Sequence, residues 1–465
     1  MTADADSPDR FDLVVIGAGS AARDAAGKAE REHGARVALV ESTRWGGSCP
    51  NTACQPTKAY LVAAELLHDV NALAERMGID AGVASLDLAR TKAWKDSRKR
   101  PQPEWVANLK TAGLETVEGE ASLLDARTVR VGERRLAADR ILIGTGSRTA
   151  VPPIEGIGSI DWVDHVSALE LTELPESLLV VGAGAVGLEL GQAFSRFGSR
   201  VTIVDGVDRI AFRSDHEASA ALAGALEAEG VELILDAFVG SVRPDGAEAV
   251  ATIAPRDGSA PRELRVSRLL LASGRLPNVE RLGLEAAGVA ATRLGITVDD
   301  RLRTTAEGIW AAGDVTGLAQ FTPVAQYQAR IAVADMFGGH PAPADYSLLP
   351  TAIFTDPELA SIGLTEGEAG ERGLEVETVT HPASVVRATY TDSTHGIYKL
   401  VFERGSRRVL GVHVVSRGAS DVVQSLALAL RFGATVDDFA GVHHAFPTYG
   451  EGLKAAAEKA GPATG

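Results

Sequence analysis

The sequence predicts an α/β fold, and three observations indicate it. Two short apolar runs are each followed by a glycine-rich turn and a helix-forming stretch, which is the pattern of a strand that leads into a helix. A third segment, after residue 343, has strand-like runs followed by a helical stretch. The fold class is therefore α/β, with two Rossmann-like dinucleotide-binding domains and an α+β C-terminal domain.

The first strand–turn–helix unit starts with the apolar run of residues 11–16, which is typical of a buried parallel strand. A second apolar run, residues 36–40, ends in Glu41, which lies 24 positions after Gly17. The turn and the start of the expected helix between these runs contain Gly17, Gly19, Ser20 and Ala21.

The second unit repeats this pattern further along the chain. The apolar run of residues 177–181 leads into the turn, and the run of residues 200–204 ends in Asp205, 23 positions after Gly182. The turn and the helix start contain Gly182, Gly184, Val186 and Gly187.

Each turn has the residue types that a bound dinucleotide requires. The first glycine permits a tight turn, the second lets a pyrophosphate approach the backbone, and the third small residue lets the helix pack closely with its N-terminus toward the phosphate. The acid that follows hydrogen-bonds a ribose hydroxyl. One such turn is weak evidence, whereas two with their strands and acids predict that the chain binds two dinucleotides.

Proline- and glycine-rich joints predict the domain limits. These joints lie at residues 145–153, 273–278 and 340–343. In the last segment, residues 396–402 are expected to form a strand and residues 421–430 a helix. The predicted domains comprise residues 1–150, 151–272, 273–343 and 344–465.

The composition narrows the class of partner. The chain has 465 residues, of which 45% are hydrophobic and 23% charged, as in a globular protein. A net charge of −16 disfavours nucleic acid and anionic membranes as main partners. No apolar run reaches the roughly 20 residues that a membrane helix needs, and the acidic start lacks a signal-peptide pattern. We therefore expect a cytoplasmic protein.

The only two cysteines, Cys49 and Cys54, lie five positions apart. A regular helix would hold their α-carbons roughly 8.6 Å apart, beyond the reach of a disulfide. Two glycines and two prolines nearby indicate an irregular backbone, so closure is feasible. The alternative is zinc, which needs four ligands, and no further Cys or His pair at ligand spacing completes a site. The pattern favours a redox pair and no metal centre.

Three motifs give the chain a family resemblance. Gly46-Gly47-Ser48-Cys49, with Cys54 and the following Pro-Thr-Lys58, resembles the redox-active disulfide motif of the class I FAD-dependent pyridine nucleotide–disulfide oxidoreductases. Residues 304–315, which include Gly313-Asp314, are similar to the second FAD motif of that family, and residues 274–278 to another signature. The similarity is closest to the catalytic core of mercuric reductase and to dihydrolipoamide dehydrogenase.

The resemblance implies how the chain is organised. It implies an FAD-binding domain with the redox cysteines at residues 1–150, an NAD(P)-binding domain at 151–272, a segment that completes the FAD domain at 273–343, and an interface domain for dimerisation at 344–465. With the turn and acid residues above, the expected cofactor-binding residues are Gly17, Gly19, Ser20, Ala21, Glu41, Gly47, Ser48, Lys58, Gly119, Thr145, Gly146, Ser147, Gly182, Gly184, Val186, Gly187, Asp205, Gly274, Arg275, Gly313, Asp314, Phe321 and Thr322.

The resemblance also implies the chemistry. A hydride passes from the nicotinamide to FAD, which reduces the disulfide of Cys49 and Cys54. Cys54 is expected to lie against the flavin and Cys49 to attack the substrate, as a thiolate. Lys58 is expected to pair with Glu189, which follows the second glycine turn.

Asp205 favours NADH, because a carboxylate repels the 2′-phosphate of NADPH. Arg209 and Arg213 follow closely and could accommodate a phosphate, so NADPH stays open as the alternative.

One position departs from the family. Disulfide reductases of this family carry a catalytic His, five residues before a Glu, that moves a proton on the substrate thiol across the dimer. Here Glu451 is present, but Phe446 occupies the position of the His. His444 lies two residues earlier and is either a substitute base or a packing residue at the dimer seam.

The sequence therefore predicts a homodimeric flavoprotein oxidoreductase with shared active sites. Its acceptor is expected to be a thiophilic metal ion or a small disulfide that needs little general-base help. Three alternatives stay open: diaphorase-type reduction of quinones or metal ions, a Phe-containing member of the 2-ketopropyl-coenzyme M carboxylase type, and a flavoprotein subunit docked in a dehydrogenase complex.

Overall fold

The computed structural model describes residues 8–461, and its internal contacts divide the chain into two compact units. The N-terminal residues, for which no signal peptide is predicted, and residues 462–465 lie outside the described part. Unit 1 comprises Met1–Pro56, Trp94–Ala150 and Gly274–Ala344, and unit 2 comprises Thr57–Ala93, Val151–Ser273 and Asp345–Gly465.

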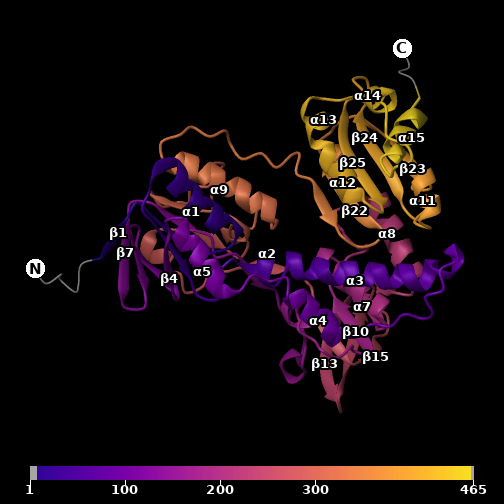
Figure 1. Cartoon of the computed structure of the whole chain (residues 1–465), viewed down its shortest axis with the longest axis horizontal. Helices are drawn as coiled ribbons and strands as arrows, with labels where there is room; N and C mark the ends of the chain where they lie inside the picture. The colour runs from indigo at the N-terminus through magenta and orange to yellow at the C-terminus, as the bar shows by residue number, and fades with distance from the viewer. Residues whose placement is uncertain (1–7, 462–465) are drawn as a thin grey trace, which may run out of the picture. The chain divides into compact units, whose positions relative to one another are not determined.

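Unit 1 is built on a five-stranded parallel sheet with the strand order β20-β8-β2-β3-β4. Its central strand β2 is buried on both faces, which explains its uninterrupted apolar sequence. Helix α1 packs on β2 and β3 and lies beside α9 (Figure 1). The sheet and these helices comprise β2 (Leu13–Ile16), α1 (Ser20–His33), β3 (Val37–Glu41), β4 (Glu115–Glu118), β8 (Ile141–Ile143), β20 (Ile309–Ala311) and α9 (Thr322–Met336).

A second sheet of unit 1 has the order β1-β7-β6-β5, and two pairs of short strands complete the unit. These strands are β1 (Asp9–Phe11), β5 (Ala121–Asp125), β6 (Thr128–Val131), β7 (Arg134–Ala138), β9 (Ser147–Thr149), β17 (Arg275–Pro277), β18 (Ala291–Thr292) and β19 (Gly295–Ile296). The remaining α-helices are α2 (Ser48–Asn51) and α5 (Gln102–Thr111), while α3 (Cys54–Leu73) and α4 (Leu88–Asp96) each continue across a unit boundary.

Unit 2 contains a four-stranded parallel sheet with the order β12-β11-β10-β16. Helix α7 packs on β10 and β11, and its residues from Gly187 to Phe194 are all buried. An antiparallel sheet, β13-β14-β15, adjoins it. The elements are α6 (His165–Ala168), β10 (Ser177–Val181), α7 (Ala185–Phe197), β11 (Arg200–Val204), α8 (His216–Ala228), β12 (Glu232–Ile234), β13 (Ala237–Asp245), β14 (Glu248–Pro255), β15 (Arg262–Val266) and β16 (Arg268–Leu271).

The last part of unit 2 is a five-stranded antiparallel sheet with the order β21-β22-β25-β24-β23. Helix α12 packs on β22 and β25, and α15 on β23 and β24 (Figure 1). The elements are β21 (Thr351–Ile353), β22 (Glu358–Gly363), α10 (Glu366–Glu371), β23 (Val376–Pro382), α11 (Val386–Tyr390), β24 (Ile397–Glu403), β25 (Val409–Ser416), α12 (Ala419–Ser425), α13 (Ala427–Arg431), α14 (Val436–Gly441) and α15 (Glu451–Lys459).

The predicted fold class is confirmed, with one local difference. Each of the two parallel sheets contains a strand that leads into a glycine turn, and an α+β segment ends the chain, as expected. The single helix expected over residues 421–430 is instead two short helices, α12 and α13, although Leu426 between them keeps helical backbone angles. The limits of the four predicted domains stay a prediction.

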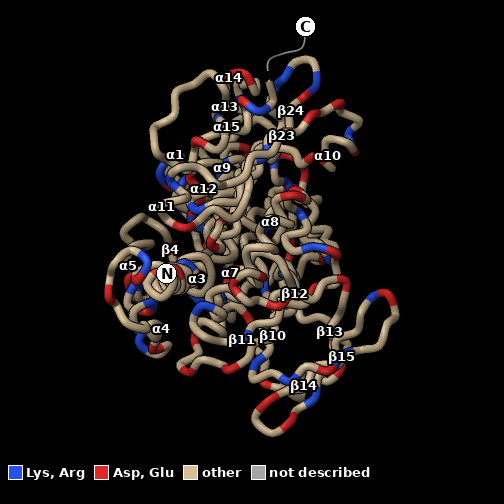
Figure 2. The backbone as a smooth tube through the Cα atoms, turned by 90° about the vertical axis from the view of Figure 1, so that its right-hand side faces the viewer, with Lys and Arg blue, Asp and Glu red and all other residues tan. Residues whose placement is uncertain are grey.

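Acidic and basic residues are interspersed along the backbone, so the net negative charge is not confined to one segment (Figure 2). Among residues 8–461, no helix is both long and apolar enough to cross a membrane.

Candidate functional site

The first glycine turn of unit 1 leaves space in front of helix α1. Gly17 has a φ of 105°, and a Cβ atom there would lie 2.3 Å from the carbonyl oxygen of Gly144, so only glycine fits. Gly19 precedes α1 as its N-cap residue and makes no side-chain capping bond, and a Cβ atom added there would meet only the Cα of Gly47, 4.0 Å away. The N–H groups of the first turn therefore fit a pyrophosphate.

Glu41 is turned toward this glycine turn. Its Oε2 accepts a hydrogen bond of 2.8 Å from the N–H of Ala18, and its Oε1 accepts one of 2.8 Å from the N–H of Thr43. Gly119 lies beside it, since the N–H of Gly119 donates to the carbonyl oxygen of Glu41 at 2.9 Å. The carboxylate is thus fixed at the end of β3, where the fingerprint requires a ribose-binding acid.

Within unit 1, the expected second FAD motif (residues 304–315) contacts the first predicted joint (residues 145–153). Ser147 Oγ donates to Asp314 Oδ2 at 2.6 Å, and Arg275 Nε donates to Ser147 Oγ at 2.8 Å. Gly313, with a φ of 84°, donates its N–H to Gln328 Oε1 at 2.7 Å. The predicted residues Ser147, Arg275 and Asp314 therefore form one polar cluster, whose carboxylate and hydroxyl fit the ribityl chain of FAD.

The cysteine loop packs directly against the first glycine turn. A Cβ atom at Gly47, which has a φ of 71°, would lie 2.4 Å from the Cα of Gly19, so the two backbones meet where glycine occupies both positions. Asn51 fastens the loop, because its Nδ2 donates to the carbonyl oxygens of Trp45 and Gly47 at 3.0 and 2.7 Å.

The two cysteines lie on different helices of this loop. Cys49 is half-buried in α2, and Cys54 is exposed as the first residue of α3. The predicted irregularity between them is confirmed, since Thr52 has non-helical angles of −140° and −5°. Cys54 Sγ lies 3.7 Å from Oγ1 of Thr322, the first residue of α9. The structure thus brings Cys54 and Thr322 together.

Sequence reasoning missed a cationic cluster beside Cys49. The guanidinium groups of Arg23 and Arg100 each lie 4.6 Å from the ring of Trp105. Burial lowers the pKa of Arg23, and the charge of the nearby Cys49 works in the opposite direction. Nothing in the local sequence marks Arg23, because its neighbours come from other segments of the chain.

We expect Arg23→Met to slow alkylation of reduced Cys49 about three- to tenfold at neutral pH, because a nearby positive charge favours the reactive thiolate. The rate is measured with iodoacetamide on the reduced holoenzyme, with the labelled peptide quantified by mass spectrometry. Arg31→Met, at an exposed position of the same helix, is the matched control. Equal rates in the parent and in the Arg23 variant would contradict the electrostatic role.

The second glycine turn, in unit 2, has the same construction. A Cβ atom at Gly187 would lie 1.9 Å from the carbonyl oxygen of Gly182, so α7 packs closely on the turn, whereas one at Gly184 would meet nothing within 4 Å. Asp205 Oδ2 accepts a hydrogen bond of 2.6 Å from the N–H of Ala183. These groups fit a second dinucleotide.

The other predicted cofactor residues lie at the starts of helices or next to the clusters above. Ser20 and Ala21 open α1, Ser48 opens α2, Val186 is in the first turn of α7, Phe321 precedes α9, and Thr145, Gly146 and Gly274 adjoin β9 and β17. Among residues 8–461, no group of three or more His, Cys, Asp or Glu side chains could hold a metal ion.

Lys58 and Glu189 form the predicted ion pair within unit 2. Lys58 Nζ lies 2.7 Å from Glu189 Oε2, and Glu189 Oε1 accepts a hydrogen bond of 3.0 Å from the N–H of Phe354. The ring of Phe354 lies 4.2 Å from Lys58 Nζ, which adds a cation–π contact. Phe354 lies in a segment that the resemblance covers, although its contact with the ion pair could not be read from the sequence.

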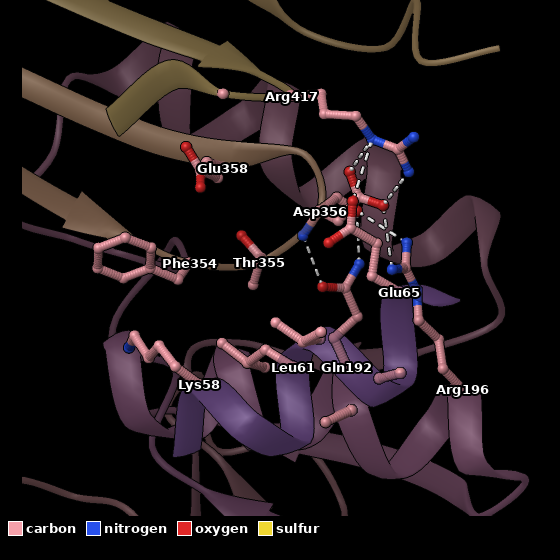
Figure 3. Close-up of a pocket in the computed structure, with 14 residues that line it drawn as sticks. Lys58, Leu61, Glu65, Gln192, Arg196, Phe354, Thr355, Asp356, Glu358 and Arg417 are labelled. Carbon is pink, nitrogen blue, oxygen red and sulfur yellow. Dashed lines mark hydrogen bonds and ion pairs between the residues drawn. The ribbon is translucent and has the colours of Figure 1, made fainter. Parts of the chain in front are cut away.

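Lys58 and Phe354 line one end of a cavity of about 180 Å³ in unit 2 (Figure 3). At the other end, Asp356 forms ion pairs with Arg196 at 3.1 Å and with Arg417 at 2.8 Å. Burial works to raise the pKa of Asp356, but the guanidinium groups of Arg417 and Arg196 outweigh it and hold that pKa below its usual value. The ion pairs fix this wall of the cavity.

The terminal segment of unit 2 carries the remaining predicted residues. Glu451 Oε2 accepts a hydrogen bond of 2.9 Å from the N–H of Thr448, and Phe446 is 72% exposed. His444 lies near Gly450, because a Cβ atom added to Gly450 would be 3.9 Å from Nδ1 of His444. Nε2 of His444 is buried and has no hydrogen-bond partner in the described part of the chain. Whether His444 acts as a base stays a prediction, as do the roles of all the site residues.

Comparison with protein families gives two matches that together span most of the chain. Residues 11–329 match the model described as "Pyridine nucleotide-disulphide oxidoreductase". Residues 349–457 match the model described as "Pyridine nucleotide-disulphide oxidoreductase, dimerisation domain".

Curated relatives and solved structures agree with these matches. The chain is 36% identical over 454 residues to the mercuric reductase of Staphylococcus aureus, covering 96% of this chain and 82% of the relative. It is 37% identical over 460 residues to that of Streptomyces lividans, covering 96% of each. It is 34% identical over 459 residues to the dihydrolipoyl dehydrogenase of Geobacillus stearothermophilus, covering 97% and 96%.

Among solved structures, the chain resembles the Cu(II) complex of the HOCl-induced flavoprotein disulfide reductase RclA from Escherichia coli. The TM-score is 0.86 at 29% identity, and the match covers 97% of this chain and 99% of that one.

Proposed function

Because the chain belongs to the pyridine nucleotide–disulfide oxidoreductase family, we propose that it is an NADH-dependent flavoprotein that reduces a thiophilic metal ion or a small disulfide through Cys49 and Cys54. The family is FAD-dependent and uses NAD(P)H. The choice of NADH, the acceptor and the roles of the individual residues belong to the proposal.

The observation that carries the proposal is the packing of the cysteine loop on the first glycine turn. Gly47 can approach Gly19 because Gly47 lacks a side chain, and Cys49 follows Gly47 by two positions. Cys54 is held at the start of α3, near Thr322. A cysteine pair fixed at the predicted FAD turn supports an electron-transfer role over a structural one.

Bound FAD would supply the two-electron relay between nicotinamide and the disulfide. The protein's own residues would then carry the exchange with a disulfide acceptor. The thiolate of Cys49 attacks one sulfur of the acceptor disulfide and forms a mixed disulfide with it, while the other sulfur of the acceptor leaves as a thiolate and takes a proton. The thiolate of Cys54 then attacks Cys49, which releases the second thiol and restores the disulfide. For a metal ion, the same two thiolates would be the ligands.

The type of acceptor follows from the missing base. Phe446 cannot move a proton, so an acceptor that requires general-base help is disfavoured. A thiophilic metal ion requires none once the thiolates have formed. The mercuric reductases among the relatives and the Cu(II) complex of the similar RclA structure support this choice.

We expect the holoenzyme to oxidise NADH with Hg(II), Cu(II) or a small disulfide as acceptor, and kcat/KM for NADH to exceed that for NADPH by about tenfold. The carboxylate of Asp205, fixed by the N–H of Ala183, repels a 2′-phosphate. Steady-state assays at 340 nm with both nucleotides test this. Equal or higher kcat/KM for NADPH would contradict the cofactor choice, and turnover with quinones alone would contradict the acceptor.

We expect the protein to sediment as a homodimer at every protein concentration measured. The terminal domain matches the dimerisation model of the family. It also exposes large apolar side chains, with Leu428, Phe432 and Phe446 exposed by 68%, 84% and 72% in the single chain. Analytical ultracentrifugation measures the mass. A stable monomer would remove the proposal that Phe446 and Glu451 complete the site of a second copy.

A further inference from the structure

The segment after Asp205 is fixed against the start of β13. The N–H of Ala237 donates to the carbonyl oxygen of Asp205 at 3.1 Å, and the N–H of Asp236 donates to that of Val207 at 3.0 Å. These backbone bonds place residue 206 beside the start of β13, within reach of the side chain of residue 238. Position 206 is the first after the acid that is expected to bind the ribose.

At this position the ring of Phe238 lies directly against Gly206. A Cβ atom added to Gly206 would come within 2.0 Å of Phe238 Cε1 and 2.6 Å of its Cζ, distances that no real side chain tolerates. Phe238 is 54% exposed, so the ring is not held there by burial in the core. Position 206 is therefore closed to any side chain as long as the ring stays in place.

Arg256 holds this arrangement. Its Nη1 donates to the carbonyl oxygen of Gly206 at 2.9 Å, and its guanidinium lies 5.7 Å from the centroid of the Phe238 ring. Its own N–H donates to the carbonyl oxygen of Asp236 at 2.7 Å. One side chain thus contacts both partners of the Gly206–Phe238 contact.

The nearest arginine that follows Asp205 in the chain is also engaged. Arg209 Nη2 donates to the carbonyl oxygen of Phe212 at 2.7 Å, and its Nη1 lies 3.3 Å from Asp208 Oδ1. These bonds direct its guanidinium into its own loop.

We propose that Phe238 restricts position 206 to glycine in the expected nicotinamide dinucleotide site, so that the choice of dinucleotide cannot be changed at this position while the ring stays in place. By filling the space that a side chain at position 206 would need, it prevents that position from presenting a basic group to a 2′-phosphate beside Asp205. The inference rests on the proposed use of NADH and adds a steric cause to the charge of Asp205.

The test is a double-mutant cycle on the FAD-loaded full chain, with nucleotide binding measured by calorimetry. The probes are 5′-AMP and 2′,5′-ADP, which differ only in the 2′-phosphate. The variants are F238A, G206R and F238A/G206R, with V83A as the control at an exposed apolar residue of the same unit, 95% exposed in the parent. We expect the preference for 2′,5′-ADP over 5′-AMP to rise about tenfold or more in F238A/G206R only.

In the parent background, G206R is expected to weaken the binding of both probes without raising the preference for 2′,5′-ADP, because the arginine and the ring compete for the same space. An equal gain for 2′,5′-ADP in G206R alone would overturn the proposal. So would a tenfold loss of 2′,5′-ADP relative to 5′-AMP in R256A, since Arg256 would then be a phosphate ligand.

A smaller substitution guards against misfolding of the arginine variants. G206A is expected to weaken 5′-AMP binding in the parent and not in the F238A background, and equal effects in both would contradict the steric contact. These readouts need no turnover. A protein that shows the expected cycle but oxidises no NADH contradicts the proposed function alone, whereas one that oxidises NADH without the cycle contradicts the steric inference alone.

Discussion

Replacing Cys49 by Ser is expected to lower kcat with a metal-ion or disulfide acceptor by about a thousandfold or more, because the attacking thiolate is removed. Reduction of bound flavin by NADH in the absence of acceptor should persist, since the predicted dinucleotide turns are untouched. Cys54→Ser should lower kcat similarly, because the exchange cannot be completed without the second thiol. Stopped-flow reduction of the flavin and steady-state NADH oxidation give the two rates separately.

Thr52→Ser, a conservative change between the two cysteines, is the matched control and should retain parent turnover. If Cys49→Ser also retains turnover with every acceptor, electrons leave without the dithiol. The diaphorase-type alternative would then replace the proposed function.

Replacing Lys58 by Met is expected to destabilise unit 2 by about 2–3 kcal/mol. The change leaves the carboxylate of Glu189, whose side chain is only 7% exposed, without its cation. The loss should be below the roughly 3–5 kcal/mol for a fully buried pair, because the Lys58 side chain is 36% exposed and water already screens it. Urea unfolding followed by circular dichroism measures the shift in midpoint.

The two single variants should differ in a definite order. Glu189→Gln should cost less than Lys58→Met, because water can solvate the remaining ammonium group and the glutamine oxygen can still accept from the N–H of Phe354. K58M/E189Q should regain most of the stability, because no unpaired charge remains. If the pair also acts in catalysis, this double variant regains stability without turnover. A larger cost for Glu189→Gln than for Lys58→Met would contradict the burial argument.

The sequence alone predicted the strands and turns whose residues are contiguous in the chain. The buried strand β2 and the glycine turn that follows it are contiguous in the chain, and so are β10 and its turn. The acids Glu41 and Asp205 come at a fixed distance from these turns, so their approach to the N–H groups of Ala18 and Ala183 could be anticipated. The Lys58–Glu189 pair joins distant segments and was predicted only because the resemblance carried it.

Contacts between distant segments without a motif could not be predicted. Arg23 lies near Cys49 and Trp105 because α1, α2 and α5 converge, and none of these positions has a local signal. The ring of Phe238 meets Gly206 only because β13 runs back to the end of β11. The break of the expected C-terminal helix near Leu426 likewise has no glycine or proline to mark it.

The central claim is that the pair Cys49 and Cys54 accepts electrons from the flavin, and an anaerobic titration of the holoenzyme with NADH tests it most directly. The flavin absorbance spectrum is followed after each addition. The proposed function predicts that a long-wavelength charge-transfer band rises before the flavin bleaches, because the disulfide is reduced first and the Cys54 thiolate lies against the flavin. Bleaching with the first equivalent of NADH and no such band would contradict it.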